Sequence, residues 1–266
     1  MYISNITPEE LDKLELGTFP GKIYVIDELG KAFDEAIRYL KHKTIIGFDT
    51  ESRPCFSAGQ PHYGVSLLQL SGSEKAYLFR VKAIGMHKKL CKLLADENII
   101  KVGAAVNDDI RGLQRLSDFK PAGFVDLQKM VGDYGIRDKS VKKMTAIILG
   151  MRISKAQQLS NWEADTLSDA QQAYAATDAW VCREMYKKLM RSKKCPLVEE
   201  TQKEEAVQAE KTVVTETETP KTESPKKKSS KKEDSKKVTP KKKASSKKKP
   251  AVRQADKKKT VKKKEA

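Results

Sequence analysis

The chain has 266 residues, and its formal net charge of +17 is unevenly distributed. Residues 1–200 hold 30 Lys and Arg against 26 Asp and Glu, a net charge of +4, whereas residues 201–266 hold 23 against 10, a net charge of +13. The first part is long enough for one domain with its own hydrophobic core. No apolar run approaches the roughly 18 residues of a membrane span, and the first residues lack the basic and apolar regions of a signal peptide. We therefore expect no membrane association.

The four cysteines, Cys55, Cys91, Cys182 and Cys195, show neither CxxC pairing nor the spacing of a metal site. This usage is typical of reduced thiols in an intracellular protein. We expect a cytoplasmic protein, with association with the nucleoid left open.

Apolar runs and helical patterns alternate through the first 190 residues. The apolar runs predict strands at KIYVID (22–27), TIIGFDTE (44–51), VSLLQLS (65–71), KAYLFRV (75–81) and IIKVGAAV (99–106). Helical periodicity predicts helices at 28–41, 86–94, 108–116, 125–134, 140–149 and 168–190. The early strands follow one another closely, as hairpin strands do, and the later part is rich in helices. This order predicts an α/β fold with a central mixed sheet flanked by helices.

The strand predicted at 44–51 ends with two acids two positions apart. Because side chains alternate along a strand, Asp49 and Glu51 should share one face with Gly47, while Phe48 lies on the other. An unpaired carboxylate in so apolar a run is costly. Either the end of this strand is solvated, or a cation lies beside the two acids.

The stretch IIKVGAAVNDDIRGLQRL indicates a buried strand, a short turn and a helix. Asn107 or Asp108 is a good candidate for the helix N-cap. Asp109 should then lie in the first helical turn, near the carboxyl end of the strand. Acids at a helix start also favour the macrodipole, which by itself is a sufficient reason for an acid here.

The last predicted helix carries an acid on its apolar stripe. Ser168 and Gln171 match a capping box and mark the start of this helix. Tyr174 and Asp178 lie one turn apart, on the stripe that continues with apolar residues, so Asp178 occupies a position where Leu or Ala is expected. Charged residues are rarely buried without a partner. A structural ion pair with a lysine is one explanation, and a bound cation is the other.

Three segments thus each offer carboxylates near one edge of the predicted sheet. Two carboxylates about 4 Å apart repel by about 4 kcal/mol at a surface-like dielectric. Gathering four of them requires cations, and ligands that are all oxygen suit Mg²⁺ or Mn²⁺. A pair of such ions is the usual machinery for in-line hydrolysis of a phosphodiester.

The stretches FDTE, KVGAAVNDDI and YAATDAW resemble the three motifs of the DEDD superfamily of 3′-5′ exonucleases. The Tyr-x-x-x-Asp spacing resembles the DEDDy branch, which includes ribonuclease D and the exonuclease domain of the Werner-syndrome helicase. None of the three histidines has an acid four residues later, so the alternative His-x-x-x-Asp motif is absent from the sequence. The similarity covers about residues 22–190, and the stretch from Ser160 onward is particularly similar to stand-alone bacterial members. It implies the RNase H-like fold.

The resemblance also implies the functional residues. Asp49, Glu51, Asp109 and Asp178 would bind two Mg²⁺ or Mn²⁺ ions, and Tyr174 would orient the attacking water. In the family, the acid of the second motif precedes an apolar residue, which favours Asp109 over Asp108, although a slip of one residue stays open.

One departure from the family pattern lies near the third motif. Related members commonly carry basic residues just after the Trp-Glu pair, whereas Trp162 and Glu163 are followed here by Ala164 and Asp165. A phosphate contact at this position is therefore in doubt. We expect Trp162 to pack in the core rather than stack on a base.

These patterns predict three segments: an N-terminal extension (1–21), an exonuclease domain (22–195) and a disordered Lys-rich tail (196–266). Beyond Leu197 the sequence has no Phe, Tyr, Trp, Leu, Ile or Met, so the tail cannot bury enough surface to fold. Its positive charge predicts binding to the phosphate backbone without sequence preference.

The main interpretation is a metal-dependent 3′-5′ exonuclease acting on the 3′ ends of DNA or RNA. A catalytically weak or inactive nucleic-acid-binding protein of the same fold is the alternative, and a plain α/β domain with a solubilising tail is a third. Ribonuclease D carries further helical domains, which are not evident in this sequence, and this slightly favours DNA or general single strands as substrates.

Overall fold

The computed structural model describes residues 1–56 and 63–197, so nearly all of the tail predicted at 196–266 lies outside the described residues. The strands are β1 (Lys22–Ile26), β2 (Ile45–Ser52), β3 (Val65–Ser71), β4 (Lys75–Phe79), β5 (Ile100–Gly103) and β6 (Phe124–Asp126). The helices are α1 (Pro8–Asp12), α2 (Lys31–Lys41), α3 (Val81–Ile84), α4 (Lys88–Leu94), α5 (Val106–Gln114), α6 (Leu127–Met130), α7 (Val141–Leu149) and α8 (Asp169–Leu189), with a 3-10 helix η1 (Val131–Tyr134). None of the described helices has the length and apolar character that crossing a bilayer requires.

The strands form one mixed sheet in the order β1-β4-β3-β2-β5-β6. Strands β2, β3 and β4 pair antiparallel, as expected for hairpins, whereas β1 joins β4 and β5 joins β2 in parallel. The register aligns Phe48, Leu70, Tyr77 and Tyr24 in one row across four strands. The predicted mixed sheet flanked by helices is therefore confirmed.

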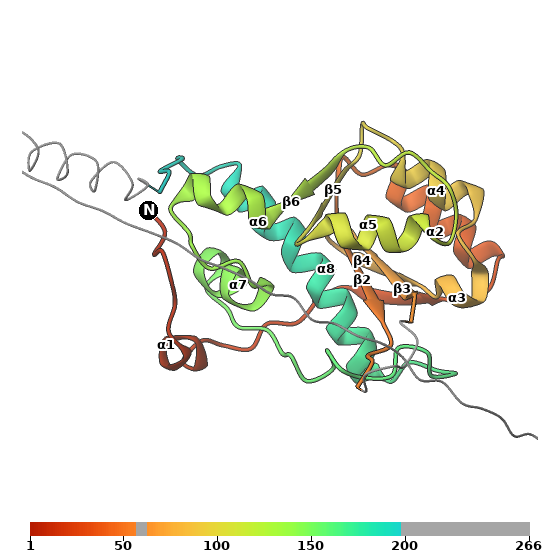
Figure 1. Ribbon diagram of the computed structural model, residues 1–266, viewed down its shortest axis with the longest axis horizontal. Coiled ribbons are helices and arrows are strands. Elements are labelled where there is room, and N and C mark those ends of the chain that lie inside the picture. Colours follow the sequence, from red (N-terminus) through yellow and green to blue (C-terminus); the bar gives the residue numbers. More distant parts are fainter. Residues whose placement is uncertain (57–62, 198–266) are drawn as a thin grey trace, which may run out of the picture. The chain divides into compact units, whose positions relative to one another are not determined.

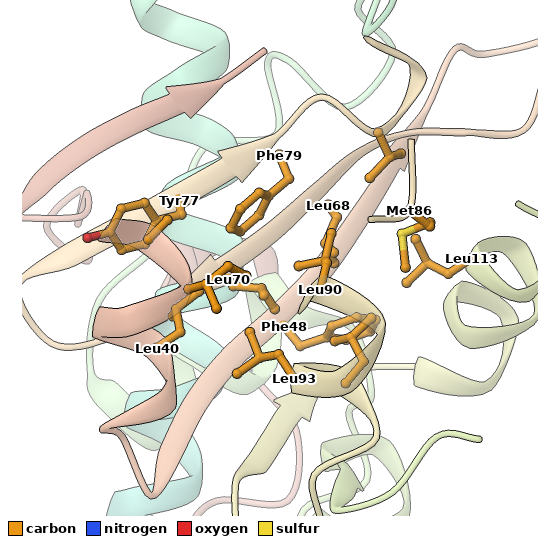
Figure 2. Close-up of a cluster of buried hydrophobic side chains, with 14 of the residues drawn as sticks. Leu40, Phe48, Leu68, Leu70, Tyr77, Phe79, Met86, Leu90, Leu93 and Leu113 are labelled. Carbon is orange, nitrogen blue, oxygen red and sulfur yellow. The ribbon is translucent and has the colours of Figure 1, made fainter. Parts of the chain in front are cut away.

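One face of the sheet is covered by α2, α4 and α5, and the contact between them is apolar. Figure 2 shows this cluster, in which Phe48, Leu68 and Leu70 from the sheet meet Leu40, Leu90, Leu93 and Leu113 from the helices. All of these side chains are fully buried. Burial of a large apolar side chain contributes about 1.5–3 kcal/mol, so this face supplies much of the stability of the fold.

The other face is crossed by α8, which contacts β1 to β5 (Figure 1). The helix lies very close to β2, because Gly47 has no side chain: a Cβ there would lie 1.8 Å from the carbonyl oxygen of Ala179. Such a distance is far inside van der Waals contact. Gly47 therefore sets how closely α8 can approach the strand that carries Asp49 and Glu51.

The N-terminal segment packs against the rest of the described fold. Leu16 forms a parallel bridge with Arg152, and the Arg152 guanidinium donates to the carbonyl oxygen of Leu14 over 2.9 Å. The backbone N–H of Phe19 donates to the Thr177 hydroxyl on α8 over 3.0 Å, and the Phe19 ring meets Trp180 edge to face. The segment is thus held at two places, one of them next to Asp178.

Several local predictions were wrong. The helix expected at 125–134 begins only at Leu127, because residues 124–126 pair with β5 as a strand. The N-cap of α5 is neither Asn107 nor Asp108 but Ala105, which adopts a left-handed conformation with φ of 58°. Helix α2 begins at Lys31 rather than at residue 28, after Gly30 as N-cap. The short helices α1 and α3 were not predicted.

Candidate active site

Three carboxylates meet where α8 crosses β2. Asp49 and Glu51 leave the same face of β2, and Asp178 faces them from α8. One carboxylate oxygen from each of the three lies within 4.8 Å of the others. Asp178 is only 8% exposed. The structure therefore brings together acids that are more than 120 residues apart in the sequence.

The positions of Tyr174 and Asp178 depend on where α8 begins and on which side of the helix packs against the sheet. Ser168 caps the helix, and the Gln171 side chain accepts a hydrogen bond from the Ser168 backbone, which confirms the predicted capping box. On the same stripe, Val181 is fully buried. The Tyr174 hydroxyl lies near the Asp178 carboxylate, and both side chains line the same cavity.

Asp109 lies beside this group but is held differently. It sits in the first turn of α5, as predicted, and accepts a hydrogen bond of 2.5 Å from the hydroxyl of Thr50, the residue between the two acids of β2. The left-handed Ala105 lets α5 begin directly after β5, and the Ala105 N–H is held by the Asp126 carboxylate over 3.0 Å. Asp109 is not one of the three acids that meet within 4.8 Å.

Asp108 occupies a different environment from Asp109. Its side chain is 78% exposed and forms an ion pair with Arg111 on the surface of α5. The geometry therefore favours Asp109 over Asp108 as the acid of the second motif.

Burial raises the pKa of each acid in this group, and repulsion within the group raises the pKa values of Asp49 and Glu51 further. Burial raises the pKa of Asp49 well above its usual range, and the charges of Asp178, Glu51 and Asp109 raise it further. The same two causes, burial first, raise the pKa of Glu51 to about 9. Burial raises that of Asp109 to about 6 despite the Thr50 hydrogen bond, and that of Asp178 to about 7 despite Tyr174 and Lys155. Without a cation, the ionised site is electrostatically unfavourable.

A cavity of about 330 Å³ opens in front of the acids. Asp49, Glu51, Asp178 and Tyr174 line it, together with the lysines Lys142 and Lys155. Lys155 is exposed and near enough to lower the pKa of Asp178. Sequence reasoning did not identify these lysines, because they stand in segments without a motif of their own.

The loop after Trp162 receives positive charge from other segments. Arg80 donates to the backbone carbonyls of Ala164 and Asp165, and Lys82 forms an ion pair with Glu163. The basic side chains that this loop lacks are thus supplied from the end of β4 and from α3. Trp162 is 1% exposed and packs with Leu67, Leu78 and Leu167, which confirms its predicted place in the core.

The chemistry of this donor set fits a divalent cation. Carboxylate oxygens are the ligands that Mg²⁺ and Mn²⁺ prefer, and three of them converge in a buried position where their own repulsion disfavours ionisation. A cation of charge two would relieve that repulsion. Asp109, held by Thr50, is near enough for its charge to raise the pKa of Asp49 and Glu51, so a fourth carboxylate lies beside this group.

The sequence and fold of this chain match known exonucleases. The 3′-5′ exonuclease family matches residues 25–193. The mouse exonuclease and helicase WRN is 29% identical over 67% of this chain and 13% of its own length. Ribonuclease D of Gluconacetobacter diazotrophicus is 29% identical over 58% of this chain and 39% of its own length. The chain thus corresponds to less than half the length of these relatives.

The crystal structure of Escherichia coli RNase D shares the fold with a TM-score of 0.57. It is 23% identical and covers 64% of this chain, which in turn covers 44% of the RNase D chain. The predicted resemblance and the RNase D-like fold are confirmed. Since the family match spans most of the described residues and includes β2, α5 and α8, which carry the acids, this chain belongs to the 3′-5′ exonuclease family.

Proposed function

We propose that this chain removes nucleotides from the 3′ end of a nucleic-acid strand with two divalent cations bound by Asp49, Glu51, Asp109 and Asp178. The observation that carries this proposal is the meeting of Asp49, Glu51 and Asp178 within 4.8 Å at the mouth of a cavity. The family is divalent-metal dependent. Bound ions would activate a water and stabilise the charge that develops on the scissile phosphate.

Tyr174 has the role of holding the water in line with the phosphate. Burial and the neighbouring acids raise the pKa of its hydroxyl above the usual value, so the phenol stays protonated at neutral pH. A neutral hydroxyl can donate one hydrogen bond and accept another. The ring packs against Trp162, with centroids 5.9 Å apart, and the hydroxyl near Asp178 would be available to orient a water molecule.

Lys142 and Lys155 would bring the substrate phosphate into the cavity. Both line it beside the acids, and their charge offsets part of the local negative potential. Lysine acts on a phosphate as a flexible point charge. These side chains therefore favour entry of a phosphate that the acids alone would repel.

The direct test is digestion of an oligonucleotide labelled at its 5′ end, with Mg²⁺, Mn²⁺ or EDTA. We expect a ladder that shortens by one nucleotide at a time with either metal and full protection in EDTA. A protein that binds the strand but leaves it intact under all conditions supports the alternative, a nucleic-acid-binding protein of the same fold.

Neighbouring acids supply a matched pair of variants for this test. Asp109→Asn should lose nearly all activity, whereas Asp108→Asn should keep it, because Asp108 points into solvent with Arg111. Tyr174→Phe should lower turnover by about 10²–10⁴-fold, the size of a general-catalysis contribution. Equal losses in the two Asp variants would contradict the assignment of the second motif.

The relatives include both DNA- and RNA-directed names, so the substrate sugar needs a separate measurement. The relative named ribonuclease D acts on RNA by its name, whereas another similar protein is the DNA polymerase I of Aquifex aeolicus. Hydrolysis at the phosphate requires no 2′-OH. We propose single strands of either sugar as substrates, with a slight preference for DNA, to be tested by rates on DNA and RNA strands of matched sequence.

The tail beyond residue 200 would act as an electrostatic tether. Its charge of +13 comes without aromatic residues, which suits binding to phosphates without base recognition. Deleting residues 201–266 should weaken binding most at low salt and leave saturated turnover unchanged. An unchanged affinity and salt dependence would identify the tail as a solubility segment.

A further inference from the structure

Aromatic and basic side chains meet at the β1 edge of the sheet, on the face opposite the acids. Tyr24 lies in the same row as Phe48, whereas Asp49 is the next residue in β2 and points to the other face. We call this cluster the tyrosine patch and define it as Tyr24, Tyr39, Tyr77, Lys43 and Lys75. By strand spacing alone it lies about 14 Å from β2.

The three tyrosines form an ordered aromatic surface. The Tyr24 and Tyr77 rings stack, with centroids 5.3 Å apart and planes at 18°, and the Tyr39 ring lies 5.6 Å from Tyr77. Tyr77 is buried and anchors the group, whereas Tyr24 is 37% exposed. Figure 2 shows Tyr77 at the end of the apolar cluster, with its hydroxyl directed away from the other labelled side chains. The core of the sheet thus continues into an aromatic surface at its edge.

Lysines are held against these rings. The ammonium of Lys75 lies 5.7 Å from the Tyr24 centroid and 5.4 Å from that of Tyr39, and the ammonium of Lys43 lies 4.3 Å from Tyr39. Cations this close to aromatic rings are attracted by the ring quadrupole. These contacts restrict the positions of the two lysine side chains, while their ammonium groups can still donate hydrogen bonds to an anion.

The patch borders a cavity of about 410 Å³. Arg38 and His42 line it along with Lys75, and the acid Glu35, which also lines it, forms an ion pair with Lys31. The volume is within the range of small-ligand sites. A planar base and an adjacent phosphate are the chemistry that stacked rings and ordered cations recognise together.

From this arrangement we propose that the tyrosine patch is a second nucleic-acid site, which binds the body of a single strand while the 3′ end lies at the acids. Stacking on Tyr24 would hold a base, and Lys75, Lys43 and Arg38 would hold phosphates. The role of the patch in guiding a substrate strand rests on the proposed exonuclease function. Binding of a strand to the patch can be measured without it. A strand must be several nucleotides long to reach both sites.

The test is the affinity of the full chain for a single strand of about 20 nucleotides, measured by fluorescence anisotropy in EDTA so that no hydrolysis occurs. Tyr24→Ala should weaken binding by roughly 5- to 50-fold, the loss of one stacked base. Tyr24→Phe keeps the ring and should bind like the unaltered chain. Lys75→Glu should also weaken binding, whereas the control Lys129→Glu, on α6 beside the other edge of the sheet, should have a much smaller effect.

Hydrolysis of a small substrate distinguishes an effect on the tyrosine patch from an effect on the acids. The p-nitrophenyl ester of thymidine 5′-monophosphate is too short to reach the patch, so its turnover with Mn²⁺ should be equal in the unaltered chain and in every patch variant. Thermal unfolding of each variant checks that the fold is intact.

Two outcomes would overturn the proposal: unchanged affinity in Tyr24→Ala, or equal losses in Lys75→Glu and Lys129→Glu, which would mean general charge attraction. If the small substrate is not hydrolysed by the unaltered chain, the proposed exonuclease function fails, while the binding result still decides the patch.

Discussion

Two neighbouring residues of β2, Phe48 and Asp49, point to opposite faces of the central sheet and meet very different surroundings. Phe48 points into the cluster under α2, α4 and α5, where the surrounding side chains are hydrocarbon and fully buried. Asp49, the next residue of the same strand, points toward α8 and meets Glu51 and Asp178. Both faces are packed with apolar side chains, but the face under α8 also carries a group of acids that repel one another.

This contrast indicates how the protein tolerates its acids. Burial raises the pKa of every member of the group, so the ionised cluster costs free energy in the absence of a cation. The stability that the apolar face contributes offsets this cost. Apolar packing on both faces of the sheet thus supports a small group of charges at the end of β2.

The largest effect should come from Asp49→Asn. Removing this charge should nearly abolish hydrolysis, because a cation would lose a ligand, yet the metal-free protein should become more stable as repulsion falls. Activity assays and chemical unfolding in EDTA measure the two effects. Asp108→Asn, as the exposed control, should change stability by less than about 0.5 kcal/mol. If Asp49→Asn lost stability but retained activity, Asp49 would be neither a required metal ligand nor a source of repulsion.

Phe48→Ala tests the opposite face. Deleting a fully buried Phe should lower the free energy of unfolding by about 3–5 kcal/mol, from lost burial and the cavity left behind. Metal affinity of the fraction that stays folded should change little. Denaturant titration gives the first quantity and calorimetry with Mn²⁺ the second. A loss below about 1 kcal/mol would mean that this cluster is not the main source of stability.

Gly47→Ala tests the contact between β2 and α8. Its new methyl group would collide with the Ala179 carbonyl, so α8 must move away from β2 and carry Asp178 with it. We expect a loss of about 1–3 kcal/mol, typical of overpacking, together with reduced activity. Gly132→Ala is a suitable control, because a Cβ there meets no atom within 4 Å. If Gly47→Ala retains full activity, the distance between α8 and β2 does not govern the site.

The last test concerns the pH dependence of stability in the metal-free protein. The folded-state pKa values of Asp109, Asp178 and Glu51 are raised to about 6, 7 and 9, so the folded protein holds these protons more tightly than the unfolded chain. Their contribution therefore favours the fold at low pH and is lost as pH rises through these values. The Tm of the metal-free protein should fall between pH 5 and pH 9, and Mg²⁺ or Mn²⁺ should raise it more at the alkaline end. A metal effect independent of pH would contradict this coupling.

The sequence predicted those parts of the fold and site that depend on local periodicity. Alternation in β2 placed Asp49 and Glu51 on one face, and the capping box at Ser168 set the start of α8 and hence the direction of Asp178. Both patterns depend on residues close in the chain, where backbone geometry alone determines which side chains share a face. The three-layer arrangement followed from the order of the elements.

Other features depended on tertiary contacts and could not be predicted. Residues 124–126 form a strand because β5 offers them a partner, although the stretch itself has helical periodicity. Ala105 adopts a left-handed conformation that Asn or Gly reaches more easily, because its N–H is held by Asp126, twenty-one residues later. Likewise, nothing near Thr50 indicates its hydrogen bond with Asp109.

Helix α8 comes last among the described elements and touches five strands, which has a consequence for synthesis on the ribosome. The chain emerges from its N-terminus first. The face of the sheet that α8 covers therefore stays exposed until α8 has been made. Phe19 likewise finds Thr177 only after 158 residues have followed it. A nascent chain therefore carries Asp49 and Glu51 without Asp178 until 127 further residues have been added after Glu51. Any cutting of nucleic acid that depends on all three acids can begin only after translation has passed α8.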